Sequence, residues 1–498
     1  MAAGERIILS IDQGTTGTTV LLVALGRQLT VVGRGYCELA QHFPQPGWVE
    51  HDLAEIWTSV QVATGRALAA ADLPPTAVHS IGVANQRETV GVWRPDGQPL
   101  GRAIVWQDRR TSSLCRRLVD LGHEQGVRAK TGLVLDPYFS ASKILWRSQH
   151  DGELRALMRA GAVRVGTVDS WLLACLTGHR GRHATDVTNA ARTMLFDIHR
   201  RAWDPGLCDL FGLDNAQVLP EVLDNADRFG VTADAGVIPD GIPICGVAGD
   251  QCAALFGQSC LDEGMAKCTY GTGAFALVNT GTEPVASARG LISTIAWRHR
   301  GATCYALEGS IFVAGAIIQW LRDGLGIIRH SSEVEALAAS VSDSGGVTLV
   351  PALTGLGAPH WRPQARGLLA GLTRGTGPGH IARAALEGIA LQVLDLLESM
   401  RLECGGALGV LRVDGGASAN GLLMQLQADL LGIAIERPRQ LESTALGAAL
   451  WAAIGDGTIA APEQVRSMWD CETQFVPCRE RTHLRDLMQA WQRRVLEA

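Results

Sequence analysis

The segment Arg6–Thr19 combines residue types that bind phosphate groups and divalent cations. An apolar, β-branched run that includes Ile7 and Ile11 ends at Asp12, and a glycine and a cluster of threonines follow. Backbone N–H groups of a glycine turn can face an anion, and threonine hydroxyls add donors. A carboxylate at a strand end suits Mg²⁺, which prefers oxygen ligands. The segment lacks the G-x-x-x-x-G-K-[ST] pattern, so it predicts a phosphate turn other than a P-loop, with a plain hairpin turn as the alternative.

Polar residues follow apolar strands at several further points. These are Gln86-Arg87-Glu88, Trp106-Gln107-Asp108, Asp250-Gln251 and Asp414-Gly415-Gly416. In α/β sheets, ligands gather beyond the carboxyl ends of strands. One polar strand end is ordinary, but these segments together with Asp12 predict a shared site.

Asp250 is the candidate for acid–base chemistry. It follows the apolar run Ile244–Ala248, and a carboxylate there can accept a proton from a substrate hydroxyl. The alternative is a helix N-cap ahead of Ala253. Arg87 and Glu88 form an adjacent opposite-charge pair that can hold vicinal hydroxyls, with Arg donating and Glu accepting. The alternative for this pair is a surface salt bridge.

Aromatic side chains are candidates for contact with the carbon atoms of a small ligand. Trp106 and Phe275 offer flat apolar faces that suit a short carbon backbone, although spacing does not separate this role from core packing. Tyr138 follows Pro137 in a segment that reads as a polar loop, which makes it a candidate for the same site.

Two glycine-containing turns lie in the second half of the chain. Thr272 sits between Gly271 and Gly273 and predicts a second phosphate turn. Gly416 precedes Asn420 at the start of a predicted helix. The glycine would let a flat ring approach the backbone, and Asn420 could hydrogen-bond to that ring. Glycine-rich turns are common, so neither turn is decisive alone.

Composition limits the class of protein. The chain has 498 residues, of which 47% are hydrophobic and 19% charged, so it predicts a folded protein of two or more domains. A net charge of −6 disfavours a nucleic-acid or anionic-membrane surface. The 12 cysteines fit no zinc pattern and read as buried thiols of a reducing compartment. No secretory signal or long apolar run is evident, so a cytoplasmic location is expected.

The periodicity predicts α/β alternation that restarts after about residue 255. Expected strands are Ile7–Ile11, Thr19–Val23, Val31–Tyr36, Val78–Ala84, Ala103–Trp106, Ala266–Tyr270 and Gly409–Val413. Expected helices are Asp52–Ala70 with Asp52 as N-cap, Arg109–Leu121, Asp169–Leu176, Ile311–Asp323, His380–Arg401, Ala419–Leu431, Thr444–Ile454 and Arg479–Arg494. Both halves open with a β-rich segment and a Gly/Thr turn, which predicts two related halves around a cleft. The expected domains are 1–255, 256–460 and a helical tail, 461–498.

A series of motifs, in order along the chain, resembles the FGGY carbohydrate kinases. The motifs include Asp12–Thr16 (DQGTT), Asn85–Thr89 (NQRET), Asp136–Ser140 (DPYFS), Thr188–Phe196 (TNAARTMLF), Gly249–Gln258 (GDQCAALFGQ), Tyr270–Gly273 (YGTG), Gly355–Trp361 (GLGAPHW) and Val413–Asn420 (VDGGASAN). The resemblance runs from about residue 5 to about residue 455. Within the family, the Gln-Arg-Glu and Asp-Pro-Tyr-Phe-Ser segments are similar to those of members that phosphorylate glycerol.

The resemblance implies two actin-like (ribonuclease H-like) ATPase domains that flank a catalytic cleft. The implied reaction is transfer of the γ-phosphoryl group of ATP to glycerol, giving sn-glycerol 3-phosphate, with Mg²⁺ as cofactor. The implied acceptor site has Asp250 as general base, with glycerol held by Arg87, Glu88, Trp106, Tyr138, Asp250, Gln251 and Phe275. The implied nucleotide site comprises Thr15, Thr16, Gly17, Thr19, Thr272, Gly315, Gln319, Gly416 and Asn420, with Asp12 placing the metal. Family members assemble as dimers or tetramers, so a homo-oligomer is expected.

The chain departs from the family pattern near the phosphates and in a regulatory segment. Many members have an arginine where this chain has Thr19, which predicts a lost positive contact. The stretch Thr232–Pro243 has no Arg or Lys, so inhibition by fructose 1,6-bisphosphate is expected to be weak or absent. No histidine lies between Asp224 and Pro243, which makes activation by histidine phosphorylation doubtful.

Two other functions are consistent with the same motifs. One is a kinase for another small polyol or ketose, such as erythritol, xylulose or dihydroxyacetone. The other is a non-catalytic, nucleotide-switched actin-like protein. The Gln-Arg-Glu segment and Asp250 favour glycerol turnover over both.

Overall fold

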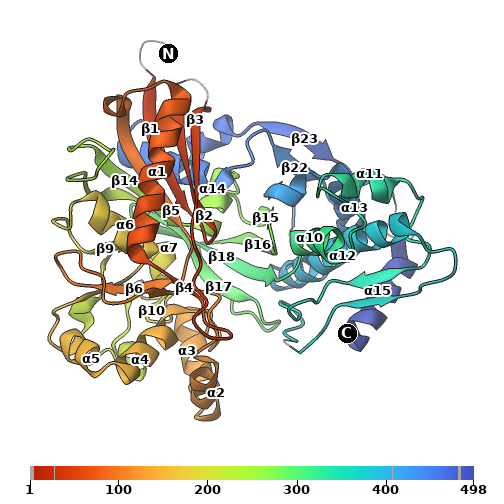
Figure 1. Cartoon of the computed structure of the whole chain (residues 1–498), viewed down its shortest axis with the longest axis horizontal. Coiled ribbons are helices and arrows are strands. Elements are labelled where there is room, and N and C mark those ends of the chain that lie inside the picture. Colours follow the sequence, from red (N-terminus) through yellow and green to blue (C-terminus); the bar gives the residue numbers. More distant parts are fainter. Residues whose placement is uncertain (1–4, 27–28, 363, 407, 480–483) are drawn as a thin grey trace.

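Two mixed β-sheets with helices packed around them form the two halves of the chain (Figure 1). The computed structural model describes residues 5–26, 29–362, 364–406, 408–479 and 484–498. In Figure 1 the N-terminal half, red to yellow, and most of the C-terminal half, teal to blue, lie on opposite sides of a group of green strands, whereas α14 lies on the N-terminal side. The α/β class with two halves agrees with the prediction.

The first sheet has six strands in the order β13-β14-β5-β1-β2-β3. Their bounds are β1 (Arg6–Gln13), β2 (Gly17–Leu25), β3 (Leu29–Glu38), β5 (Val78–Asn85), β13 (Ala226–Val231) and β14 (Pro243–Gly249). Strands β1, β5 and β14 are parallel neighbours, and Asn85 is in register with both Gln13 and Gly249. Because parallel strands end at the same edge, the residues after β5 and β14 lie beside Asp12.

The second sheet has seven strands in the order β17-β18-β16-β15-β21-β22-β23. Their bounds are β15 (Ala266–Tyr270), β16 (Ala274–Gly281), β17 (Ile292–His299), β18 (Ala302–Ile311), β21 (Leu411–Asp414), β22 (Ile435–Pro438) and β23 (Cys471–Phe475). Strand β15, like β1, has an antiparallel hairpin partner on one side and a parallel strand on the other. The two hairpin turns are also alike: the Gly14 amide donates to the Gly17 carbonyl, and the Gly271 amide to the Gly273 carbonyl, each at 2.9 Å. The repeat predicted from the sequence is therefore present in the topology.

Helix α14 (Ser443–Gly455) joins the two halves. It lies between strands β22 and β23 of the second sheet in the chain but packs against β14, β5 and β1 of the first sheet and against helix α9 (Asp250–Gly257). The approach is close: a Cβ atom at Gly82 would lie 2.1 Å from the Ala448 carbonyl oxygen. The Ser10 hydroxyl donates to the Ala445 carbonyl at 2.5 Å. The helix is apolar on all sides because it is buried on all sides.

The remaining elements complete the two halves. A smaller sheet comprises β4 (Glu50–His51), β7 (Ala103–Ile104), β6 (Val90–Trp93) and β8 (Arg164–Thr167). Short strand pairs are β9 (Ala184–Asp186) with β12 (Glu221–Leu223), β10 (Phe196–Asp197) with β11 (Ala202–Trp203), and β19 (Thr348–Val350) with β20 (Leu368–Ala370). The other helices are α1 (Leu53–Ala71), α2 (Ser112–Asp120), α3 (Glu124–Thr131), α4 (Ser140–His150), α5 (Gly152–Arg159), α6 (Val168–Leu176), α7 (Val187–Ala190), α8 (Pro205–Leu210), α10 (Gly315–Asp323), α11 (Glu333–Ala339), α12 (Pro378–Glu403), α13 (Gly421–Leu431) and α15 (Arg485–Glu497). Among the described residues, no helix has the length and apolarity needed to cross a membrane.

Most predicted elements are present, and their errors lie at the ends. Asp52 caps α1 as predicted, accepting from the amide of Ala54 at 2.8 Å. The helix predicted to begin at Ile311 begins at Gly315, because Ile311 is the last residue of strand β18. The strand predicted over Ala103–Trp106 ends at Ile104. The predicted tail helix is shifted to Arg485–Glu497, and part of the predicted range, 480–483, lies outside the described residues.

Candidate active site

The edge of the first sheet brings Asp250 next to Arg87. Gly249 caps helix α9 and Asp250 is its first residue, so the N-cap interpretation of Asp250 is wrong. The Gly249 amide donates to the Thr188 hydroxyl at 2.8 Å, and that hydroxyl in turn donates to Asp186 at 2.5 Å. The Asp250 side chain remains 27% exposed while Arg87 beside it is 2% exposed, so the carboxylate is available to a ligand.

Arg87, Glu88, Arg192 and Glu308 form a closed ring of alternating charge, called here the charge ring. Glu308 accepts from Nη1 and Nη2 of Arg87 at 2.6 and 2.8 Å. Arg192 donates to Glu308 at 3.1 Å and to Glu88 at 2.6 Å, and Glu88 lies 4.0 Å from Nε of Arg87. None of the four side chains is more than 2% exposed, so the interpretation of Arg87 and Glu88 as a surface salt bridge is wrong.

The electrostatics of the charge ring follow from this burial. Burial alone would raise the pKa of Glu308, but Arg192 and Arg87 together lower it to about 2. Burial also raises the pKa of Glu88, and the two arginines offset only part of that increase. Glu308 is therefore the carboxylate of the ring that the arginines hold ionised most strongly.

Glu88 has an unusual backbone conformation. Its φ angle is +63°, in the left-handed region that costs a non-glycine residue about 1 kcal/mol or more. The Ser140 hydroxyl donates to the Glu88 carbonyl at 2.9 Å, and the Thr89 amide donates to the Arg87 carbonyl at 2.7 Å. These contacts hold the turn after β5 in the shape that directs Glu88 toward Arg192.

Three predicted aromatic residues meet in front of the charge ring. The ring of Trp106 packs edge-on against Tyr138, with centroids 5.4 Å apart, and against Phe275, with centroids 6.3 Å apart. The indole N–H of Trp106 donates to the Thr15 hydroxyl at 2.9 Å, which connects the aromatic group to the first phosphate turn. The buried Lys143 donates to the backbone carbonyls of Pro137, Tyr138 and Phe139 and so fixes the loop that carries Tyr138.

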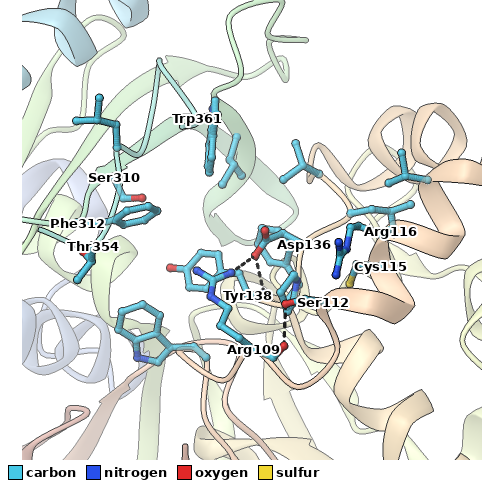
Figure 2. Close-up of a pocket in the computed structure, with 18 of the residues that line it drawn as sticks. Arg109, Ser112, Cys115, Arg116, Asp136, Tyr138, Ser310, Phe312, Thr354 and Trp361 are labelled. Carbon is cyan, nitrogen blue, oxygen red and sulfur yellow. Dashed lines mark hydrogen bonds and ion pairs between the residues drawn. The ribbon is translucent and has the colours of Figure 1, made fainter. Parts of the chain in front are cut away.

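The aromatic group lines a cavity of about 740 Å³ between the two halves. Figure 2 shows Ser310, Phe312 and Thr354 on one wall and Cys115 and Arg116 of helix α2 on the opposite wall. The lining includes Trp106, Tyr138 and Phe275, but not Arg87, Glu88 or Asp250. The four side chains of the charge ring are buried and are not among the residues that line this cavity.

A second cavity, of about 520 Å³, gathers the predicted nucleotide residues of the C-terminal half. Its lining includes Thr272, Gly315, Gln319, Gly416 and Asn420. Asn420 also caps α13, its side-chain oxygen accepting from the Leu423 amide at 2.9 Å. Gly415 has φ +84°, and a Cβ atom there would lie 2.6 Å from the Tyr270 carbonyl oxygen. Only glycine suits this position, which immediately precedes Gly416 of the cavity wall.

Asp12 is the residue best suited to hold a metal ion. Its half-buried carboxylate has no hydrogen-bond partner within the described part of the chain. Burial, together with the nearby carboxylates of Asp250, Glu442 and Asp414, raises its pKa well above the ordinary range. A divalent cation would supply the missing positive charge. No group of three or more potential metal ligands occurs among the described residues. Mg²⁺ is an ion that proteins hold with one or two carboxylates together with substrate phosphates.

The threonines in and after the first phosphate turn have different partners. Thr15 receives the Trp106 indole N–H, and the Thr16 carbonyl accepts from the Leu39 amide at 2.9 Å. Gly17 begins strand β2. Thr19 pairs with Asp12 across β1 and β2, so both side chains lie on one face of the sheet. The turn, Thr19 and Asp12 thus adjoin one another, as the sequence predicts.

Sequence reasoning missed four charged residues that hold the site together: Lys143, Arg192, Lys267 and Glu308. Lys267 is fully buried and donates to the side chains of Gln251 and Thr269. Burial lowers its pKa, and Asp414 offsets part of the decrease. The sequence does carry a signal for Lys267 and Glu308, since each is the sole charged residue of a largely buried strand.

Comparison with known proteins identifies both halves. The model of the FGGY family of carbohydrate kinases, N-terminal domain, matches residues 7–257, and the C-terminal domain model matches residues 266–455. A glycerol kinase of Myxococcus xanthus is 53% identical over 95% of both chains, and one of Aromatoleum aromaticum is 52% identical over 99% of this chain and 98% of that protein.

Solved structures agree with these matches. Glycerol kinase of Plasmodium falciparum with ADP superimposes with a TM-score of 0.92 at 36% identity, covering 99% of this chain and 98% of that one. A xylulose kinase of Lactobacillus acidophilus has a TM-score of 0.87 at 20% identity, covering 98% and 97% of the two chains, and shows the shared fold alone.

Proposed function

Because the chain belongs to the FGGY family of carbohydrate kinases, we propose that it transfers the γ-phosphoryl group of ATP to a terminal hydroxyl of glycerol, giving sn-glycerol 3-phosphate. The relatives named glycerol kinase support this substrate, since they match nearly the whole chain. The observation that carries the proposal is the position of Asp250, whose partly exposed carboxylate lies 3.0 Å from the Arg87 guanidinium at the edge of the first sheet. This arrangement suits a small acceptor with adjacent hydroxyls and a short carbon chain.

Asp250 acts as the general base in this proposal. The acceptor oxygen forms a bond to the γ-phosphorus while the bond from that phosphorus to the β–γ bridging oxygen breaks. The hydroxyl proton passes to the Asp250 carboxylate, and ADP leaves with the bridging oxygen. Arg87, Glu88, Tyr138 and Gln251 orient the acceptor hydroxyls, and Trp106 and Phe275 cover its carbon atoms. Most of the rate enhancement comes from this positioning.

The nucleotide is bound by the two phosphate turns and the second cavity. Thr15, Thr16, Gly17, Thr19 and Thr272 donate to the phosphates, and Gly315, Gln319, Gly416 and Asn420 contact the rest of the nucleotide. Mg²⁺ held by Asp12 and phosphate oxygens would neutralise charge on the phosphates. Because Thr19 carries no charge, it supplies less electrostatic stabilisation of the phosphates than an arginine would.

A coupled assay of ADP release tests the proposal. MgATP is supplied with glycerol or with erythritol, xylulose or dihydroxyacetone, and kcat/KM is compared. Glycerol should exceed the other acceptors by about tenfold or more. A higher value with another acceptor would replace glycerol in the proposal, and ATP-dependent filament growth without turnover would favour a nucleotide-switched structural protein.

The proposal extends to the organisation of the protein in the cell. We expect a cytoplasmic homo-oligomer, dimer or tetramer, built from domains that meet near residue 255. The segment after residue 460, predicted as a helical tail, instead adds strand β23 to the second sheet before helix α15. Light scattering after size-exclusion chromatography measures the assembly. A monomer at micromolar concentration would contradict that part of the proposal.

A further inference from the structure

Glu308 is a buried charge that the second half contributes to the acceptor side of the site. It lies on strand β18, paired with Leu277 of β16 and Ile292 of β17, and its strand neighbours are buried. The other members of the charge ring, Arg87, Glu88 and Arg192, all come from the first half. A buried carboxylate is costly unless it is fully paired. The hydrogen bonds to Glu308 come from Arg87 and Arg192 of the opposite half, and the charge of Lys267 adds to their effect.

The geometry of the Arg87–Glu308 pair determines how Arg87 faces Asp250. Both terminal nitrogens of Arg87 donate to Glu308, at 2.6 and 2.8 Å. A planar two-point contact of this kind fixes the plane of the guanidinium. The remaining nitrogen, Nε, is the one that lies 3.0 Å from Asp250. Without Glu308, the terminal nitrogens would be free to turn toward Asp250 or Glu88.

We propose that Glu308 is a positioning residue for the acceptor: it fixes Arg87 from the opposite half so that Nε faces Asp250, whose partly exposed carboxylate is then directed at an acceptor hydroxyl. Arg192 completes the arrangement by holding Glu88 at 2.6 Å and Glu308 at 3.1 Å. The inference rests on the proposed function, because it assigns a role within the same site. It also makes acceptor binding depend on how the two halves pack together.

The test compares Glu308→Gln with Glu387→Gln. Glu387 is the matched control, a buried glutamate of the C-terminal half that is paired at 2.9 Å with Arg383 within helix α12. Glu308→Gln should raise KM for glycerol about tenfold or more, because the charged contact to Arg87 is lost. KM for ATP should stay within about twofold. Glu387→Gln should leave both KM values within about twofold of wild type, whatever its melting temperature.

A double-mutant cycle separates positioning from a purely structural role. If Glu308 acts through Arg87, Glu308→Gln should add little to the KM defect of Arg87→Gln. Equal and additive effects on KM, or a loss of thermal stability with an unchanged KM for glycerol, would overturn the proposal. If Glu308→Gln does not fold, Glu308→Asp enters the same cycle, because it keeps the charge but shortens the reach to Arg87.

Failure of the proposed function gives a different result. Wild-type enzyme without glycerol turnover, but active on another acceptor, would refute glycerol as substrate. The cycle would then be measured with that acceptor, where the same coupling between Glu308 and Arg87 is expected, and its absence would overturn the role of Glu308.

Discussion

The proposed acceptor and nucleotide regions of this kinase differ in the residues that form them. The acceptor region has charged side chains fixed by ion pairs, with the charge ring almost fully buried behind Trp106, Tyr138 and Phe275. The nucleotide cavity is lined mainly by glycines, alanines and short polar side chains at turns and helix starts. Side chains held by opposite charges discriminate between patterns of hydroxyl groups, whereas backbone surfaces bind groups common to every nucleotide. Substitutions in the two regions should therefore affect different kinetic constants.

Asp250→Asn should have the largest effect on catalysis. Asparagine keeps the size of the side chain but cannot accept the acceptor proton, so kcat should fall by about 10²- to 10⁴-fold. Affinity for ATP, measured by calorimetry, should stay within a few-fold of wild type. Turnover close to wild type would remove Asp250 as the base and leave the acceptor region with a binding role only.

Arg192→Met should have the largest effect on stability. It leaves Glu88 and part of Glu308 buried without their partner, at a cost of about 3–5 kcal/mol in unfolding free energy. The control is Arg466→Met, since Arg466 pairs with Asp262 at the surface with 45% of its side chain exposed, and such pairs contribute about 1 kcal/mol or less. Urea titration compares the two variants. Equal losses of unfolding free energy in the two variants would show that the charge ring stabilises the fold no more than a surface ion pair does.

Gly315→Ala tests the nucleotide region. A Cβ atom at Gly315 would lie 2.6 Å from the Gly271 carbonyl oxygen, so the start of α10 must move away from the second phosphate turn. KM for ATP should rise about tenfold, as expected for an overpacked contact, with KM for glycerol little changed. Gly409→Ala is the control, because no atom lies within 4 Å of its added Cβ. A rise in KM for glycerol instead would contradict the separation of the two regions.

Trp106→Phe should have the smallest effect and should affect both regions. Phenylalanine keeps an aromatic face against Tyr138 but loses the N–H that donates to Thr15 at 2.9 Å. One such hydrogen bond contributes about 1 kcal/mol, so each KM should change by a few-fold. Steady-state kinetics with each substrate varied in turn would detect this, and a change confined to glycerol would show that the contact with Thr15 has no role in nucleotide binding.

The sequence predicts elements and strand ends well but not the partners of charged residues. Local apolar runs predict β1, β5 and β15. They also place Asp12, Arg87 and Asp250 at or just after strand ends, because the position of a strand end depends on nearby residues alone. Arg87 and Glu308 are 221 residues apart, and no local pattern reports a contact over that separation. The two wrong alternatives, a capping Asp250 and an exposed Arg87–Glu88 pair, have the same origin. Each interpretation rests on the residues next to Asp250 or Arg87 in the sequence. In the fold, the environment of Asp250 depends on Thr188, which binds the Gly249 amide, and that of Arg87 depends on Glu308.

Strand β18 limits where residues can be inserted or deleted, in addition to which residues can be substituted. The strand carries Glu308, and residues 312–314 then lead to Gly315 at the start of α10. Side chains alternate between the faces of a strand, so inserting or deleting one residue just before Glu308 would turn it away from Arg87. A change of length between residues 308 and 315 would instead displace Gly315 from the nucleotide cavity. We therefore expect insertions to be tolerated in the turn between His299 and Ala302, but not in the stretch from Glu308 to Gly315, where acceptor and nucleotide share one segment of backbone.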